Sequence, residues 1–262
     1  MVPSASPATR WHLPDLPAPD APIPIVDTAT MTEADRITTD RIGFGLLQMM
    51  ENAGHQLAEL TRLALGGSVI DRRVVILAGT GNNAGGGMVA ARRLAGWGAD
   101  TCVAFAQPIL RLRPGACAQV EPLLAAGVRA AVAGHDRSIA ELRDEIGGAD
   151  AVIDALIGYS LRGAPDETYR PLIDIAAAGA GMVISLDVPS GIDATTGERP
   201  GMAVSADATL ALALPKLGTT IGVGVRHAGA GYLADIGIPS SVFHELGLET
   251  RRMFAAGPLL RT

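Results

Sequence analysis

The stretch 73-RVVILAGTGNNAGGGMVAARRLAGWG-98 joins three patterns that together decide the fold. An apolar run over 74–78 stops at the glycine-rich segment 79–87, and a helical pattern of apolar residues continues to about residue 97. A strand, a glycine-rich turn and a helix in this order are typical of α/β proteins that bind nucleotides, because free N–H groups at a helix start can receive a phosphate. The stretch therefore indicates an α/β fold with a ligand site at the turn.

Strands and helices alternate along the rest of the chain. A helical segment over 31–67 comes first, with a break at Gly43 and Gly45 and with Thr32 and Asp35 resembling a capping pair at its start. The predicted strands are 73–78, 101–106, 128–133, 150–154, 182–187, 207–213 and 231–236, and the later helices are 85–97, 115–126, 137–147 and 167–179. Continuous apolar strands between amphipathic helices predict one doubly wound domain, with a mostly parallel sheet that helices cover on both faces.

Composition and charge exclude several classes of protein. Of 262 residues 48% are hydrophobic and 18% charged, as in a folded protein. The net charge of −6 gives no reason to expect a nucleic acid partner. No apolar run reaches the roughly 18 residues of a membrane span, and the first residues lack a signal-peptide core. We expect a cytoplasmic protein with no membrane contact.

The chain divides into three parts by composition. Residues 1–25 form a Pro/Ala-rich arm, which we expect to be ordered only where it docks. Residues 26–250 form the domain, and residues 251–262 form a C-terminal tail. Cys102 and Cys117 are too few, and too far from any histidine cluster, to indicate a disulfide framework or a metal site.

The glycine-rich turn does not fit the common nucleotide motifs. A loose G-x-G-x-x-A pattern is present, but a dinucleotide site also needs an acid at the end of the second strand to hold the ribose, and Gln107 stands there. Asp100 lies before that strand, at the wrong edge. An NAD-dependent dehydrogenase is therefore disfavoured, and a Walker P-loop is excluded because no Gly-Lys-Ser/Thr follows. Ser160 lacks the second glycine of a nucleophile elbow, which excludes a serine hydrolase of that kind.

Two aspartates end apolar strands at the edge where α/β proteins bind ligands. Asp154 and Asp187 both follow such strands and would face the same crevice. Either carboxylate could instead cap the loop that follows it. Asp187 leads into the stiff turn Pro189-Ser190-Gly191, which favours a functional role. Oxygen ligands without clustered His or Cys suit a hard cation, if a metal is bound.

Six segments together resemble the YjeF-type N-terminal domain family, the NAD(P)H-hydrate (NAD(P)HX) epimerases. They are 49-MMENAG-54, 79-GTGNNAGGG-87, 150-DAVIDALIG-158, 184-ISLDVPSGIDATTG-197, 209-TLALALPKLG-218 and 232-YLADIGIP-239. The resemblance runs from about residue 26 to 245. It implies a Rossmann-like three-layer αβα sandwich and a homodimer. It also implies interconversion of the R and S hydrates of NADH and NADPH, which carry water across the C5–C6 bond of the nicotinamide. We expect the dehydratase that restores the S form to be a separate protein.

The resemblance also implies the site residues. Those that would bind the NAD(P)HX substrate are Asn82, Asn83, Ala84, Gly85, Gly86, Gly158, Tyr159, Ser160, Leu161, Arg162, Gly163, Ala164, Asp187 and Lys216, the only lysine of the chain. Those that would hold a potassium ion are Asn83, Asp154 and Ser190. Asp187 is the expected catalytic acid–base group, which assists loss of the C6 hydroxyl. Burial would favour the protonated form that an acid needs.

Two loops depart from the family pattern. The family loop G-N-N-G-G-D-G reads 81-GNNAGGG-87 here, so Gly86 replaces an aspartate, and the family's G-T-G becomes Gly158-Tyr159-Ser160. Loss of a carboxylate removes a hydrogen-bond acceptor worth about 1–3 kcal/mol to a polar ligand. Two alternatives to the epimerase therefore stay open. One is an enzyme of the same fold that acts on another small molecule, and the other is a non-catalytic ligand-binding or dimerisation module.

Overall fold

An eight-stranded sheet forms the centre of the residues that the structure, a computed structural model, describes, namely 11–178 and 181–262. Its strands are β1 (Arg73–Ala78), β2 (Asp100–Phe105), β3 (Arg129–Val132), β4 (Ala151–Ala155), β5 (Met182–Leu186), β6 (Ala208–Leu212), β7 (Ala230–Ala234) and β8 (Leu259–Arg261). Their order is β3-β2-β1-β4-β5-β6-β7-β8, parallel except for the β7–β8 pair. The seven predicted strands are confirmed, and the order reverses between β1 and β4, where α/β proteins bind ligands.

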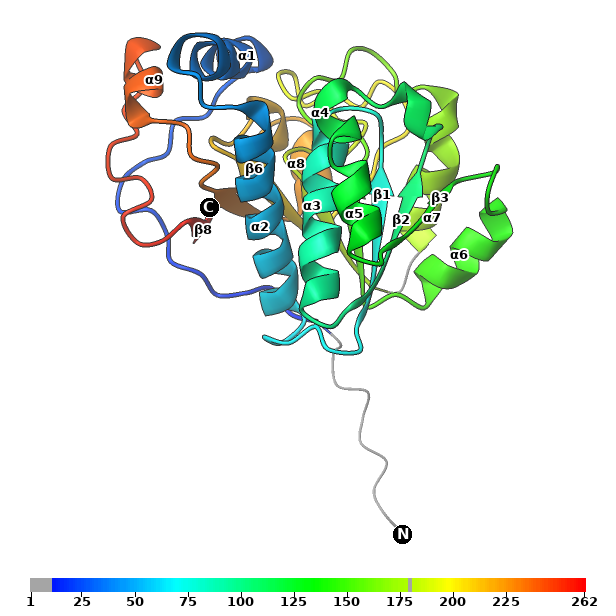
Figure 1. Cartoon of the computed structure of the whole chain (residues 1–262). Helices are drawn as coiled ribbons and strands as arrows, with labels where there is room; N and C mark the ends of the chain where they lie inside the picture. The colour runs from blue at the N-terminus through cyan, green and yellow to red at the C-terminus, as the bar shows by residue number, and fades with distance from the viewer. Residues whose placement is uncertain (1–10, 179–180) are drawn as a thin grey trace.

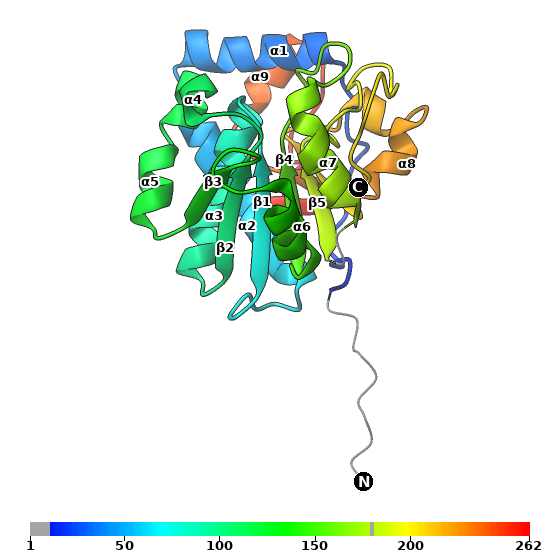
Figure 2. The same ribbon diagram turned by 90° about the vertical axis from the view of Figure 1, so that its right-hand side faces the viewer.

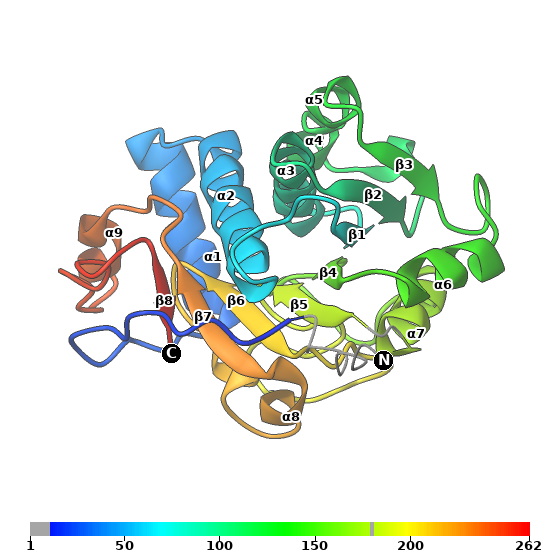
Figure 3. The same cartoon turned by 90° about the horizontal axis from the view of Figure 1, so that it is seen from below.

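Helices cover the sheet on both faces. They are α1 (Thr28–Arg36), α2 (Leu46–Ala64), α3 (Asn82–Gly96), α4 (Pro114–Cys117), α5 (Val120–Ala125), α6 (Ile139–Gly147), α7 (Arg170–Ala178), α8 (Gly224–Ala228) and α9 (Ser240–Glu245). Figures 1 and 3 show α2, α3 and α5 on one face and α6 and α7 on the other. Figure 2 shows α1 across the ends of the strands. The predicted αβα sandwich is confirmed.

The alternation of side chains along β1 builds two separate cores. Val74, Ile76 and Ala78 pack with α2 and α3, whereas Val75 and Leu77 pack with α6 and α7. All five are fully buried. A strand that is apolar at every position is therefore needed, because both of its faces meet a helical layer.

The two ends of the described chain meet at the β8 edge of the sheet. Residues 259–261 form β8, a strand that the sequence patterns did not predict. Pro17 O accepts a hydrogen bond from Arg261 N (3.0 Å), and Pro14 O accepts one from Tyr232 Oη (2.9 Å). The described part of the arm is thus ordered by docking. Residues 1–10 and the predicted helix residue 179 lie outside the described residues.

The glycine-rich segment is mostly helix, which corrects the prediction of a turn up to residue 85. Helix α3 begins at Asn82. A Cβ on Gly85 would lie 2.7 Å from Met50 Sδ, and one on Gly87 would lie 2.6 Å from Ala155 Cβ. These glycines are needed because α3 packs very closely against α2 and the sheet. In the sequence, a cluster of glycines with this packing role looks the same as a glycine-rich turn.

The first helix also begins earlier than predicted. Its N-cap is Asp27, whose carboxylate accepts a hydrogen bond from Thr30 N at 2.8 Å. Thr32 bonds to Thr28 O within the helix, so Thr32 and Asp35 are not a capping pair. After α1 the chain makes a π-helical turn, η1 (Ile37–Ile42), and breaks at Gly43 as predicted.

Two further elements of the sequence prediction differ in detail. The predicted helix 115–126 is split into α4 and α5, and 167–179 begins with a 3₁₀ turn, η3 (Glu167–Tyr169). The other 3₁₀ turns are η2 (Ile109–Arg111) and η4 (Leu217–Thr219). No helix in the described ranges is long and apolar enough to cross a membrane.

Candidate functional site

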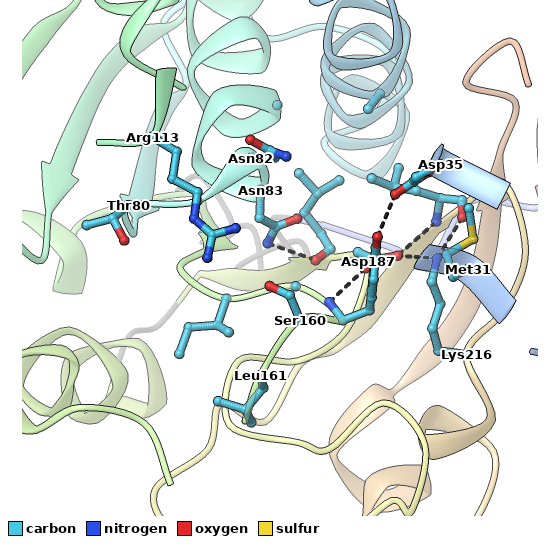
Figure 4. A pocket seen from close by; sticks show the side chains of 18 of the residues that line it. Met31, Asp35, Thr80, Asn82, Asn83, Arg113, Ser160, Leu161, Asp187 and Lys216 are labelled. Carbon is cyan, nitrogen blue, oxygen red and sulfur yellow. Dashed lines mark hydrogen bonds and ion pairs between the residues drawn. The ribbon is translucent and has the colours of Figure 1, made fainter. Parts of the chain in front are cut away.

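A cavity of about 380 Å³ lies at the carboxyl ends of the strands. Its walls come from α1, α2, the start of α3 and the loops that follow β1, β2, β4, β5, β6 and β7. Figure 4 shows the polar side chains that point into it. The cavity therefore occupies the place that the strand order predicts for a ligand.

A buried ion pair forms one wall of the cavity. Asp187 follows β5 with a left-handed backbone (φ 72°), and its Oδ1 lies 2.5 Å from Lys216 Nζ. Tyr159 N donates to Asp187 Oδ2 at 3.0 Å, and Lys216 Nζ also donates to Leu212 O at 2.7 Å. Both side chains are nearly inaccessible to solvent. The carboxylate of Asp187 is therefore held in place by a buried ion pair and by a backbone hydrogen bond.

A second carboxylate faces this pair from helix α1. Tyr159 Oη donates a hydrogen bond to Asp35 Oδ2 at 2.5 Å, and the Tyr159 ring lies 5.6 Å from Lys216 Nζ. Burial raises the pKa of Asp35, and the Asp187 charge adds to the rise, whereas the Tyr159 bond and Lys216 oppose it. Burial also raises the pKa of the Tyr159 hydroxyl, with Asp35 contributing. Burial of Asp35 thus favours its protonated form.

Asp154 is fully buried and does not line the cavity. Its carboxylate accepts hydrogen bonds from Ser185 Oγ (2.7 Å), Ser190 N (2.9 Å), Ser190 Oγ (2.5 Å) and Leu156 N (3.2 Å). Burial raises its pKa, and these hydrogen bonds oppose the rise. Asp154 and Ser190 are therefore in contact, whereas the prediction that Asp154 faces the same crevice as Asp187 is wrong, because Asp154 does not line the cavity.

The residues around Asp154 fit a cation that prefers oxygen ligands. Among the described residues no basic side chain pairs with Asp154. Asn83 uses its amide nitrogen to bond Leu186 O (3.1 Å), which leaves its Oδ1 available. No group of three His, Cys, Asp or Glu side chains in the described ranges could hold a metal. A cation bound beside Asp154 would have one carboxylate and otherwise neutral oxygen atoms as ligands. Such a ligand set suits a hard ion of low charge.

Most of the predicted ligand residues line the cavity. They are Asn82, Asn83, Gly86, Gly158, Tyr159, Ser160, Leu161, Arg162, Ala164, Asp187 and Lys216. Ala84, Gly85 and Gly163 do not. Ala84 is fully buried and Gly85 packs against Met50, because both lie on the sides of α3 that face other elements. Asp100 forms an ion pair with Arg129 at the opposite edge of the sheet, so it cannot hold a ligand here.

Several cavity residues had no signal in the sequence. Asp35 and Met31 come from α1, Tyr169 ends the 3₁₀ turn η3, and Arg113 extends from the loop after β2. Each belongs to a segment that looked like an ordinary helix or loop. The sequence shows Asp35 only as a carboxylate on a predicted helix, and it does not show that this side chain is buried.

Comparison with known proteins connects this cavity to one family. A family described as the N-terminus of YjeF-related proteins matches residues 46–218. A protein of Dehalogenimonas lykanthroporepellens named NAD(P)H-hydrate epimerase is 42% identical over 239 residues, which cover 90% of this chain and 91% of that protein. One of the same name from Truepera radiovictrix is 36% identical, covering 81% of this chain and 90% of its own length.

Longer relatives carry the matching region as a part. The bifunctional NAD(P)H-hydrate repair enzyme Nnr of Hyperthermus butylicus is 42% identical over 183 residues, which are 68% of this chain and 32% of that protein. The crystal structure of the yeast protein ynu0 superposes with a TM-score of 0.77 over 92% of this chain and 100% of its own, at 23% identity. That likeness establishes the fold.

Proposed function

The chain belongs to the YjeF-related N-terminal family, and from this premise we propose that it interconverts the R and S forms of NAD(P)H hydrate, an isomerase reaction of cofactor repair. Two relatives with that name match this chain over about nine-tenths of their length. The observation that carries the proposal is the buried Asp187–Lys216 pair, which presents a fixed carboxylate to a cavity at the ligand edge of the sheet. A pair this deeply buried is costly to desolvate, so a role in chemistry explains it better than stability does.

The reaction that we assign to the site proceeds by loss and return of water at C6 of the hydrated ring. The C6–hydroxyl bond breaks, the ring nitrogen stabilises the resulting cation, and water adds to the other face. Asp187, held in place by Lys216, accepts the proton of the attacking water. In the reverse direction the same group returns that proton to the leaving hydroxyl. Asp187 is thus the proposed catalytic residue, and the other cavity residues hold the substrate.

The remaining parts of the proposal concern the cation and the partners. We assign a potassium ion to Asn83, Asp154 and Ser190, where it would neutralise a buried carboxylate and fix the ends of β4 and β5. A homodimer, a separate dehydratase and a cytoplasmic location stay predictions. The Nnr relatives, whose name denotes two functions, extend well beyond the region matched by this chain.

The test uses a mixture of the R and S forms of NADHX in potassium-containing buffer, with a dehydratase specific for the S form. That dehydratase alone converts the S form and then stalls at the slow spontaneous exchange. We expect added protein to remove the stall and Asp187→Asn to leave it in place. If the wild-type protein binds NAD(P)-like ligands and the stall persists, the site acts on another small molecule. If it binds none, the binding or dimerisation module is the better description.

A further inference from the structure

Exchange of a hydroxyl between two faces of a ring needs proton transfer on both faces. The leaving hydroxyl takes up a proton on one face, and the attacking water gives up a proton on the other. Asp187 is held by Lys216 Nζ (2.5 Å) and Leu212 N (3.4 Å) at Oδ1 and by Tyr159 N (3.0 Å) at Oδ2. A carboxylate fixed at both oxygens cannot swing around the substrate, so a second group must serve the far face.

The carboxyl groups that line the described cavity leave one candidate for that second group. Arg113 and Arg162 do not release protons in proteins. Asp166 is exposed, and its hydrogen bonds with Thr168 lower its pKa, so it is ionised near neutral pH. Tyr159 already donates its hydroxyl proton to Asp35. The remaining carboxyl group is Asp35.

We propose that Asp35 is the second acid–base group of this reaction and serves the face of the ring turned away from Asp187. The inference rests on the proposed epimerase function of the same cavity. Asp35 projects from α1, which lies across the strand ends, whereas Asp187 projects from the end of β5 (Figures 2 and 4). Tyr159 contacts both residues, with its backbone N–H on Asp187 and its hydroxyl on Asp35.

The surroundings of the two carboxyl groups differ. Asp35 faces Tyr159 from the loop after β4, Asp187 from the end of β5 and Lys216 from the segment after β6. Burial raises the pKa of Asp35 against the effect of Tyr159 and Lys216. Asp187 is instead paired directly with Lys216. In the proposed reaction Asp35 is therefore the acid and Asp187 the base, as a two-face reaction needs.

Each step of the reaction then balances. When the C6 hydroxyl points toward Asp35, the carboxyl proton moves to that oxygen, and the C6–O bond breaks with its electron pair leaving in water. The nitrogen lone pair forms the C=N bond of the cation. A water on the other face forms the new C6–O bond, and its proton goes to Asp187. Proton exchange with solvent resets the two carboxyl groups, and the opposite epimer follows the same steps in reverse.

The test compares Asp35→Asn with wild type, using each purified epimer in water labelled with ¹⁸O. Two rates are measured, epimerisation and entry of ¹⁸O at C6. We expect Asp35→Asn to slow epimerisation about 100-fold or more, as for loss of a general acid. The epimer whose hydroxyl faces Asp187 should still exchange its oxygen without inversion, because Asp187 can serve its own face in both directions. In Asp187→Asn, the epimer whose hydroxyl faces Asp35 should still exchange its C6 oxygen with the solvent.

Glu33→Gln is the matched control, because it removes a carboxylate of the same helix that pairs at the surface with Arg36. It should leave both rates unchanged. Binding of NADP⁺ and circular dichroism report whether each variant is folded. Tyr159→Phe, which keeps the carboxyl group of Asp35 and removes its hydrogen-bond donor, provides a second variant. Wild-type epimerisation in Asp35→Asn overturns the inference and leaves the function standing. Equal loss of exchange in both epimers also overturns it, since that indicates a structural role. A wild-type protein that does not epimerise overturns the function and the inference together.

Discussion

Lys216 Nζ lies 2.5 Å from Asp187 Oδ1, with the two side chains 1% and 3% exposed. Lys216 is the only lysine among 21 basic residues, and its stem is buried like a core side chain. Arginine has a rigid planar fork, whereas the compact ammonium of lysine can donate to both Asp187 and Leu212 O in a small space. The geometry therefore explains why this one position is lysine.

Replacing one partner of this ion pair should destabilise the protein more than its share of the loss when both partners are replaced. We expect Lys216→Met and Asp187→Asn each to lower the free energy of unfolding by about 3–5 kcal/mol, because each leaves a buried group without its partner. Asparagine is the right replacement for Asp187, since it tolerates the left-handed backbone there. The double variant should lose clearly less than the sum of the two single losses. Urea unfolding of the four proteins measures this coupling, and strictly additive losses would contradict it.

Removal of the Tyr159 hydroxyl should move the pH dependence of the reaction upward. The hydrogen bond from Tyr159 stabilises ionised Asp35 and so lowers a pKa that burial has raised. If Asp35 acts in its protonated form, activity falls as pH rises through its folded-state pKa. In Tyr159→Phe that pKa is higher, so the fall should occur at higher pH. Rates of epimerisation between pH 5 and 9 show the shift, and a fall that moves to lower pH would refute the assignment.

The sequence predicted the sheet well because each strand carries its own local signal. Seven apolar runs became seven strands, and Asp154 and Asp187 lie where the ends of those runs placed them. Strand β8 has only three residues, and it forms because its backbone pairs with β7. No local pattern marks such a strand, since its stability comes from a distant partner.

The site was predicted only in part, for a similar reason. Loops that carry a family motif were found, whereas Asp35 was assigned to a helix cap. Its role depends on a contact with Tyr159, 124 residues away along the chain. The contact between Asp187 and Lys216 was not predicted either, because it is a property of the fold.

A potassium ion at Asp154 should appear as a salt-specific gain in stability. A ligand that binds only the folded state raises stability by mass action. We expect a higher melting temperature in potassium chloride than in tetramethylammonium chloride at equal ionic strength. Asp154→Asn should remove the difference between the two salts. An equal melting temperature of the wild-type protein in both salts would count against the ion.

The close packing of α3 can be tested with two glycines of the same helix. A Cβ on Gly87 would lie 2.6 Å from Ala155 Cβ and 3.1 Å from Ile76 Cγ2, whereas nothing lies within 4 Å of one on Gly96. Gly87→Ala should therefore destabilise the protein by about 1–3 kcal/mol or more. Gly96→Ala should be neutral or stabilise it by up to about 1 kcal/mol. Thermal unfolding separates the two, and similar effects would mean that α3 can move away from the sheet.

We expect Gly86 to affect how the cavity binds the polar groups of its substrate. It replaces the aspartate of the family pattern, and a Cβ there would lie 3.0 Å from Leu186 Cδ2. That methyl group ends a flexible side chain, so a shift of a few tenths of an ångström would admit a side chain. Gly86→Asp then adds an acceptor beside the apolar wall of Met50 and Ala53. A charge-assisted hydrogen bond is worth about 1.5–3 kcal/mol, so KM for the hydrate should fall about tenfold or more.

Gly86→Ala is the control for this change, because it fills the same space without adding an acceptor. Its KM should equal or exceed that of the wild type, and kcat should change little in either variant, since Asp187 and Asp35 are untouched. A lower KM in the aspartate variant alone would mean that the cavity still holds the hydrate in the family's orientation and has lost one contact. If the two variants behave alike, the substrate does not reach α3 at this turn, and Tyr159 together with the loop after β4 must position it instead.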